Sequence, residues 1–163
     1  MERTLFIVRH GKSSWDYVMD DIDRPLTERG VKNSYDMANR LADVGMVPEM
    51  ILSSPANRAL HTALIMARVW NIPEDKIRIS RGLYLPDEED IFNAIAGIEN
   101  SVASMAIFGH NPGFTHFANG FSSRSIDNVP TAGVVVVRLE AEAWNDLINA
   151  KVSEVIFDYP KSR

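Results

Sequence analysis

The sequence predicts an α/β fold, a three-layer α/β/α sandwich formed by a single domain over residues 1–163. Short, continuous apolar runs end at residues 8, 52 and 108, as buried strands do. Segments whose apolar residues recur at helical spacing alternate with these runs. The 163 residues, 45% hydrophobic and 24% charged, also have the size and composition of one globular domain.

In the first half of the chain, helix-start and helix-stop residues delimit the elements. Thr27 is the expected N-cap of a helix that ends near Gly45. Ser54 as N-cap, with Pro55 at the first helical position, predicts a second helix. The expected order is a strand at 4–8, a loop at 11–25, a helix from 27 to about 44, a strand at 50–53 and a helix that ends before Pro73.

In the second half, strands and helices continue to alternate. Residues 83–86 lead into a helix that begins near Asp87 and carries an apolar stripe. Asn111 is expected to cap a short helix, and the valine run after Ala132 indicates a central strand. The expected order is a short strand at 77–80, a helix, a strand at 104–108, a short helix, a loop at 122–130, a strand at 132–139, a short helix at 141–148 and an edge strand at 152–157.

The composition excludes several classes of function. A formal net charge of −5 and a pI of about 5.3 argue against a general nucleic-acid-binding protein. Without cysteine, the chain has no disulfide, no thiolate chemistry and no cysteine-based zinc site. It shows no signal-peptide layout, and no apolar stretch approaches the ~18 residues of a membrane span. We therefore expect a cytoplasmic protein that binds no membrane, with a monomer as its simplest state.

Histidine and arginine residues lie at the ends of three expected strands. His10 and His110 directly follow two of them, and Arg9 and Arg58 lie at or shortly after a strand end. Ligands of open α/β sheets bind beyond the carboxyl ends of strands, so we expect these side chains to face one crevice. Arginine matches phosphate oxygens with a planar fork of donors, and histidine attacks phosphorus or moves protons near neutral pH. The pattern predicts a site for a phosphoryl group.

Four motifs occur in order, each at a strand end: Arg9-His10-Gly11-Lys12-Ser13-Ser14-Trp15; Asp23-Arg24-Pro25-Leu26-Thr27-Glu28-Arg29-Gly30; Ser54-Pro55 with Arg58-Ala59 and Thr62-Ala63; and Gly109-His110-Asn111-Pro112. Over residues 4 to about 140 the chain thereby resembles the histidine phosphatase superfamily, also called phosphoglycerate-mutase-like. It is most similar to the small SixA-type branch, which includes protein phosphohistidine phosphatases. The resemblance implies a largely parallel sheet with an antiparallel strand late in the chain.

The resemblance also implies roles for individual residues. His10 is the expected nucleophile, which forms a phosphohistidine that water then hydrolyses. Arg9 and Arg58 are expected to hold the phosphoryl oxygens, and His110 to donate to the same oxygens with the help of its charge. We expect no metal and no other cofactor, because these cationic side chains take the place of a metal. The candidates for substrate binding are Gly11, Lys12, Ser13, Arg24 and Asn111.

Each substrate-binding candidate also has a structural interpretation. Gly11 allows a tight turn, Asn111 caps its helix, and Arg24 belongs to a helix entry. Lys12 and Ser13 either contact the substrate or are solvated. A histidine at a strand end is more often structural than catalytic. For His10, however, the presence of all four motifs in order favours a catalytic role.

The position of a general acid bears on the substrate. Many members of the superfamily carry a glutamate after the third strand, in a leucine, any residue, glutamate pattern, where this chain reads Leu83-Tyr84-Leu85. Imidazole leaves readily once it is protonated, with a pKa near ~6.5, so a phosphohistidine substrate tolerates a missing acid. The other acidic candidates are Glu88, Glu89 and Asp90, which fit the first turn of a helix, and Asp20, Asp21 and Asp23 in the first loop.

We therefore predict a metal-independent phosphatase that acts on phosphohistidine in proteins. The alternatives are a phosphatase of small phosphoesters or phosphoramidates and a non-catalytic binder of a phosphorylated ligand. A mutase fits less well, because the chain is short and its acid is unplaced. The expected partner is accordingly a phosphorylated protein or a small phosphorylated molecule.

Overall fold

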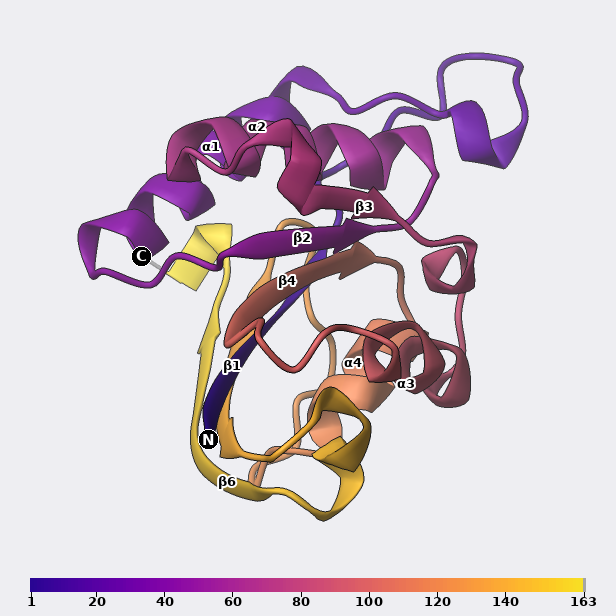
Figure 1. The fold of residues 1–163 in the computed structure, drawn as a ribbon. Helices are drawn as coiled ribbons and strands as arrows, with labels where there is room; N and C mark the ends of the chain where they lie inside the picture. The colour runs from indigo at the N-terminus through magenta and orange to yellow at the C-terminus, as the bar shows by residue number, and fades with distance from the viewer. Residues whose placement is uncertain (163) are drawn as a thin grey trace.

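The computed structural model describes residues 1–162. Its middle layer is a six-stranded sheet in the order β3-β2-β4-β1-β5-β6 (Figure 1). The antiparallel strand expected late in the chain is β5, which runs antiparallel to both of its neighbours, whereas the other pairings are parallel. The strands are β1 (Glu2–Arg9), β2 (Met50–Ser53), β3 (Ile77–Ile79), β4 (Ser104–Gly109), β5 (Val134–Glu140) and β6 (Lys151–Asp158).

Helices cover both faces of the sheet and complete the predicted three layers (Figure 1). One face carries α1 (Glu28–Asp43) and α2 (Asn57–Trp70); the other carries α3 (Glu88–Ala96), α4 (Gly113–Asn119) and the 3₁₀ helix η4 (Trp144–Asn149). The remaining 3₁₀ turns are η1 (Asp21–Asp23), η2 (Glu74–Lys76), η3 (Arg81–Leu83) and η5 (Pro160–Ser162). No described helix is long and apolar enough to cross a membrane.

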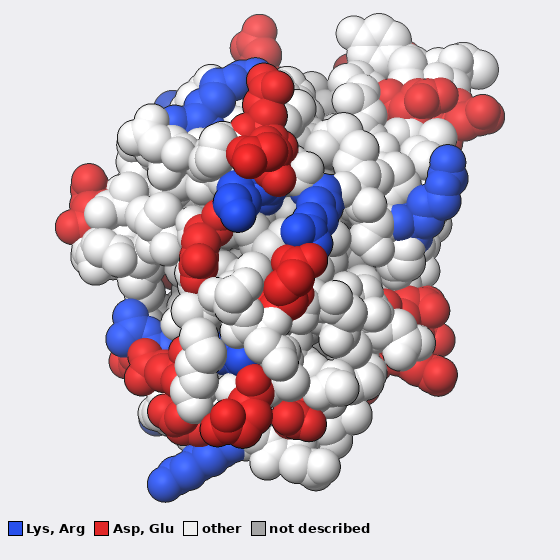
Figure 2. Space-filling model, viewed as in Figure 1, with Lys and Arg blue, Asp and Glu red and all other residues white. Residues whose placement is uncertain are grey.

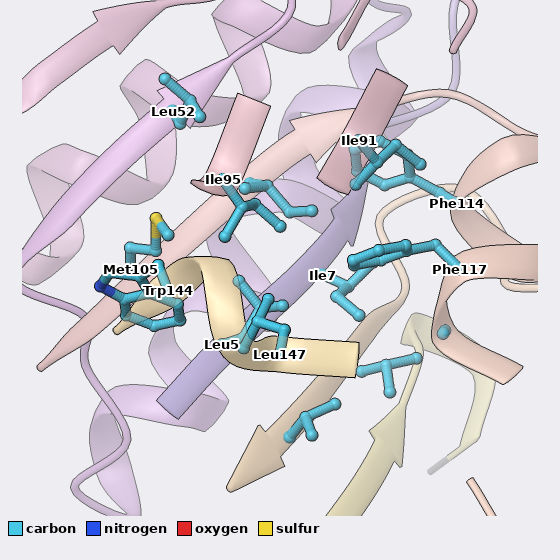
Figure 3. Close-up of a cluster of buried hydrophobic side chains, with 14 of the residues drawn as sticks. Leu5, Ile7, Leu52, Ile91, Ile95, Met105, Phe114, Phe117, Trp144 and Leu147 are labelled. Carbon is cyan, nitrogen blue, oxygen red and sulfur yellow. The ribbon is translucent and has the colours of Figure 1, made fainter. Parts of the chain in front are cut away.

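The central strand β1 is buried on both sides, as its continuous apolar run predicts. Successive side chains of a strand point to opposite faces, so Leu5 and Ile7 enter one core cluster while Phe6 and Val8 enter the other. Figure 3 shows Leu5 and Ile7 among the side chains of the first cluster. Each of the four β1 side chains is at most 1% exposed, and full burial of such a side chain stabilises the fold by about 1.5–3 kcal/mol. This core holds the carboxyl end of β1 in place.

The helix starts after the strands differ in part from the prediction. Thr27 is the N-cap of α1, as expected, and accepts a hydrogen bond from the Gly30 N–H at 3.0 Å. The expected N-cap at Ser54 is wrong, because α2 begins at Asn57 with Ala56 as its N-cap. The short helix expected at 141–148 is the 3₁₀ helix η4, which begins at Trp144. Ser54 therefore lies outside the helix, directly after the end of β2, where its hydroxyl contacts His110.

Candidate active site

Parallel pairing of β1 with β4 brings the two strand-end histidines together. Arg9, the last residue of β1, is paired with Gly109, the last residue of β4, so both strands end at the same edge of the sheet. The N–H of His10 donates to the carbonyl oxygen of Gly109 at 3.1 Å, and the ring centroids of His10 and His110 lie 5.2 Å apart. On the other side of β4, β2 ends at the same edge and leads to Arg58 in the first turn of α2.

A pocket of about 240 Å³ lies at this edge and contains eight of the nine predicted site residues. Gly11 is the one that does not line it. A larger hollow, of about 910 Å³, lies between the 121–130 loop and β6 and contains none of the nine. The residues that line the smaller pocket are Arg9, His10, Lys12, Ser13, Trp15, Arg24, Arg58, Leu85, His110, Asn111 and Thr131, with no carboxylate in this described lining.

His10 is held as a neutral imidazole with one nitrogen free. Burial of the ring, followed by the charges of Arg58, Arg9 and Arg24, lowers its pKa to about 4, although the hydrogen bond to Gly11 acts in the opposite direction. The Nδ1 of His10 lies 2.6 Å from the Gly11 carbonyl oxygen, which can only accept. The proton therefore sits on Nδ1, and Nε2 carries the lone pair that a nucleophile needs.

His110 is also neutral. Burial, followed by the effects of His10 and Arg58, lowers its pKa to about 3. Without a bound anion the ring therefore carries no charge at neutral pH, and the expected help of a His110 charge in phosphate binding stays a prediction, because a nearby phosphoryl group favours the charged form. Its Nε2 lies 2.8 Å from the hydroxyl of Ser54, while its buried Nδ1 has no hydrogen-bond partner among the described residues.

Asp21 binds two of the arginines that line the pocket. The two terminal nitrogens of Arg58 donate to the carbonyl oxygen of Asp21 at 2.7 Å and to its Oδ2 at 2.9 Å. Arg24 donates to Oδ1 at 3.0 Å, and the hydroxyl of Tyr84 donates to Oδ2 at 2.7 Å. Although burial raises the pKa of Asp21, the hydrogen bonds from Tyr84, Arg58 and Arg24 lower it to about 2. Asp21, one of the three acid candidates in the first loop, is thus an ionised carboxylate.

Arg9 approaches the pocket from the end of β1. Its Nη1 donates to the carbonyl oxygen of Val129 at 3.0 Å, and its buried Nε has no partner among the described residues. Burial, and then the charge of Arg58, lowers the pKa of Arg9. The cations Arg9 and Arg58 thus repel each other across the pocket, and an anionic ligand would relieve that repulsion.

Two of the substrate-binding candidates have structural roles. The side-chain amide of Asn111 donates to the Val129 carbonyl oxygen at 3.0 Å, and its Oδ1 accepts from the N–H and the hydroxyl of Thr115 in α4. Gly11 donates its N–H to the hydroxyl of Thr62 at 2.9 Å. A Cβ at Gly11 would lie 2.9 Å from the carbonyl oxygen of Gly30, so the missing side chain allows the first loop to pass close to α1.

The remaining candidates divide between the pocket and the surface. Lys12 is exposed at the pocket, and the hydroxyl of Ser13 accepts a hydrogen bond from Arg24. Glu88 and Glu89 lie in the first turn of α3, as expected, and do not line the pocket. Sequence reasoning did not identify five contributors: Trp15, Leu85 and Thr131 in the lining, Tyr84 as a partner of Asp21, and Ser54 as a partner of His110.

Comparisons with known proteins show similarity in sequence and in fold. A sequence model of the histidine phosphatase superfamily (branch 1) matches residues 5–83. An uncharacterized chloroplastic protein of Arabidopsis thaliana is 28% identical over 155 residues, which cover 90% of this chain and 71% of that protein. A SixA structure from Nakamurella multipartitia has a TM-score of 0.81 at 20% identity and covers 96% of both chains. The protein histidine phosphatase SixA complexed with tungstate has a TM-score of 0.79 at 24% identity, over 96% of this chain and 97% of that one. The last two likenesses concern the fold.

Proposed function

The chain belongs to the histidine phosphatase superfamily, and from this premise we propose that it is a metal-independent phosphatase that hydrolyses phosphohistidine in proteins. The observation that carries the proposal is a neutral, buried His10 beside three arginines, two of which bind Asp21, a carboxylate with a pKa of about 2. At neutral pH the pocket thus offers a nucleophile and positive charge, while Asp21 holds no proton to donate to a leaving group.

In the first step, the lone pair on Nε2 of His10 attacks phosphorus in line with the bond to the leaving nitrogen. A P–N bond forms on His10, and the P–N bond of the substrate breaks with its electron pair going to the substrate imidazole. Arg9 and Arg58 stabilise the charge on the equatorial oxygens, which is the main demand of phosphoryl transfer. The position of His110 in the lining of the pocket supports a role for that ring in contacting the same oxygens.

The leaving group decides between substrate classes. A phosphohistidine protonated on its second ring nitrogen releases neutral imidazole, so a proton from water suffices. An alkoxide leaves far less readily and needs a general acid, which typically contributes about 10²–10⁴-fold to the rate.

In the second step, water attacks the phosphohistidine on His10, which releases inorganic phosphate and restores the imidazole. The structural relative SixA was solved with tungstate, a tetrahedral oxyanion like phosphate, which supports a phosphoryl-binding role for the corresponding pocket here.

The test compares initial hydrolysis rates on a protein phosphorylated on histidine and on p-nitrophenyl phosphate, both in the presence of EDTA. We expect kcat/KM to favour the phosphohistidine protein by about a hundredfold or more, the contribution of the absent acid. Comparable rates on the ester would contradict the proposed substrate and imply an acid at another position. Phosphate binding without turnover of either substrate would instead identify a non-catalytic binder.

A further inference from the structure

The loop between β1 and α1 exposes four large apolar side chains within five consecutive residues. The exposed fractions are 78% for Trp15, 61% for Tyr17, 108% for Val18 and 41% for Met19. We call residues 15–19 the apolar tip. The loop projects from the upper right of the fold in Figure 1, and the same corner of Figure 2 shows uncoloured side chains beside acidic ones. Clustered apolar exposure on a soluble domain is typical of an interaction site.

The base of the loop holds the apolar tip in a defined position. Ser13 forms a β-bridge with Leu26, and the N–H of Ser14 donates to the carbonyl oxygen of Pro25 at 2.8 Å. The guanidinium carbon of Arg24 lies 3.2 Å from the centre of the Trp15 ring. This cation–π contact restrains an exposed indole before any partner arrives, which reduces the entropy lost on binding.

The apolar tip is continuous with the catalytic pocket. Trp15 lines that pocket, and so does Leu85, which is 56% exposed and comes from the segment before α3. Asp16 within the tip, and Asp20 and Asp23 shortly after it in the sequence, are exposed carboxylates. Small phosphorylated metabolites are polar and gain little from apolar contacts, whereas protein interfaces favour tryptophan, tyrosine and methionine at their centre.

We propose that the apolar tip is the docking surface for the protein that carries the phosphohistidine. The matching partner surface is an apolar patch beside the phosphorylated histidine, edged by lysine or arginine residues that complement the three aspartates of the loop. The inference rests on the proposed function and adds to it the element that selects a protein over a small phosphoramidate. Because Arg24 contacts both Trp15 and Asp21, docking takes place beside the residues that hold Arg58.

The experiment uses a double variant, Tyr17→Ser with Val18→Ser, at two exposed positions that do not line the pocket. The matched control is Val44→Ser with Val47→Ser, two exposed positions beyond the end of α1. The substrates are N-phosphoimidazole and a panel of folded proteins phosphorylated on histidine with potassium phosphoramidate. We expect KM for the preferred protein to rise about tenfold in the tip variant with kcat unchanged, and kcat/KM for N-phosphoimidazole to stay at the wild-type value.

The outcomes separate this inference from the proposed function. An unchanged KM for the protein, with normal turnover of N-phosphoimidazole, would overturn the docking surface alone. A wild-type dimer in sedimentation that the tip variant dissociates would assign the surface to a second copy and also overturn it. No turnover of any phosphohistidine substrate by the wild type would overturn the function together with the docking surface.

Discussion

Asp21, in the loop before α1, and Arg58, in the first turn of α2, are joined by two hydrogen bonds of 2.7 and 2.9 Å across 37 residues of sequence. The Arg58 side chain is only 4% exposed, so its charge is held in place within the fold. Such preorganised charge requires no rearrangement when negative charge develops on a phosphoryl group. The pair therefore links the first loop to the chemistry of the pocket.

Replacement of Asp21 by Asn should destabilise the fold in a pH-dependent way. The pKa of Asp21 is about 2 in the folded protein, below its value in the unfolded chain, so its ionised form contributes stability above pH ~4. That contribution is lost as the pH falls toward 2. Thermal unfolding should show a lower Tm for the variant at pH 7 and a smaller difference at pH 3. Asp36→Asn, on α1, is the control, and a difference that is constant with pH would contradict the linkage.

Replacement of His10 by Ala should abolish turnover, because it removes the nitrogen that we propose as the acceptor of the phosphoryl group. We expect kcat to fall by about a thousandfold or more. Rapid quenching after mixing with a ³²P-labelled phosphohistidine substrate should trap an acid-labile label on the wild-type chain and none on the variant. His116→Ala, at an exposed position of α4, should behave as the wild type. A label that persists in the His10 variant would place the nucleophile elsewhere.

The ionisation of His10 should set an acid limit to activity. With a pKa of about 4, the ring stays neutral and nucleophilic down to roughly pH 5 and loses its lone pair below about pH 4. An NMR titration of the imidazole protons should show this low inflection, with the His10 signals identified by their loss in His10→Ala. An inflection near the ordinary value of ~6.5 would mean that burial and the neighbouring arginines do not control the ring.

Arg58→Lys should retain the positive charge but lose the two hydrogen bonds that Arg58 donates to Asp21. Lysine is a point charge without the planar fork that donates to Asp21 and matches phosphoryl oxygens. We expect kcat/KM to fall by about a hundredfold, the size of effect typical for loss of one preorganised donor. Arg78→Lys is the matched control, because Arg78 pairs with Glu99 on the exposed surface. Equal losses in both variants would argue against a specific role for the Arg58 fork.

Gly30→Ala should destabilise the loop that carries the catalytic motif. A Cβ at Gly30 would lie 2.3 Å from the carbonyl oxygen of Lys12, a backbone atom that cannot move without shifting the loop. We expect the free energy of unfolding to fall by about 1–3 kcal/mol. Gly97→Ala has open space around its Cβ and should be neutral or stabilising by up to about 1 kcal/mol. Denaturant unfolding of both variants checks the difference.

Local patterns in the sequence were sufficient to locate most of the pocket. The β1 run and the β4 run each end directly before a histidine, and the parallel register of Arg9 with Gly109 then places both rings at one edge. Helix ends were less predictable: Ser54 fits the rules for an N-cap, but α2 begins at Asn57, and the Ser54 hydroxyl accepts from the Ala56 N–H and contacts His110. Tertiary contacts competed there with local preference and prevailed.

The sequence by itself determined the alternation of strands and helices and the sheet edge at which the motifs meet, because both depend on short-range periodicity and on residues that follow a strand. The roles of Arg9, His10, Arg58 and His110 came from the family resemblance and stay predictions. Only the tertiary structure decided that Asp21 joins Arg58, Arg24 and Tyr84. A loop without periodicity carries no local signal for a partner 37 or 63 residues away. The pKa values of both histidines were likewise decided by the fold, since burial is their largest cause and arises only when distant elements pack together.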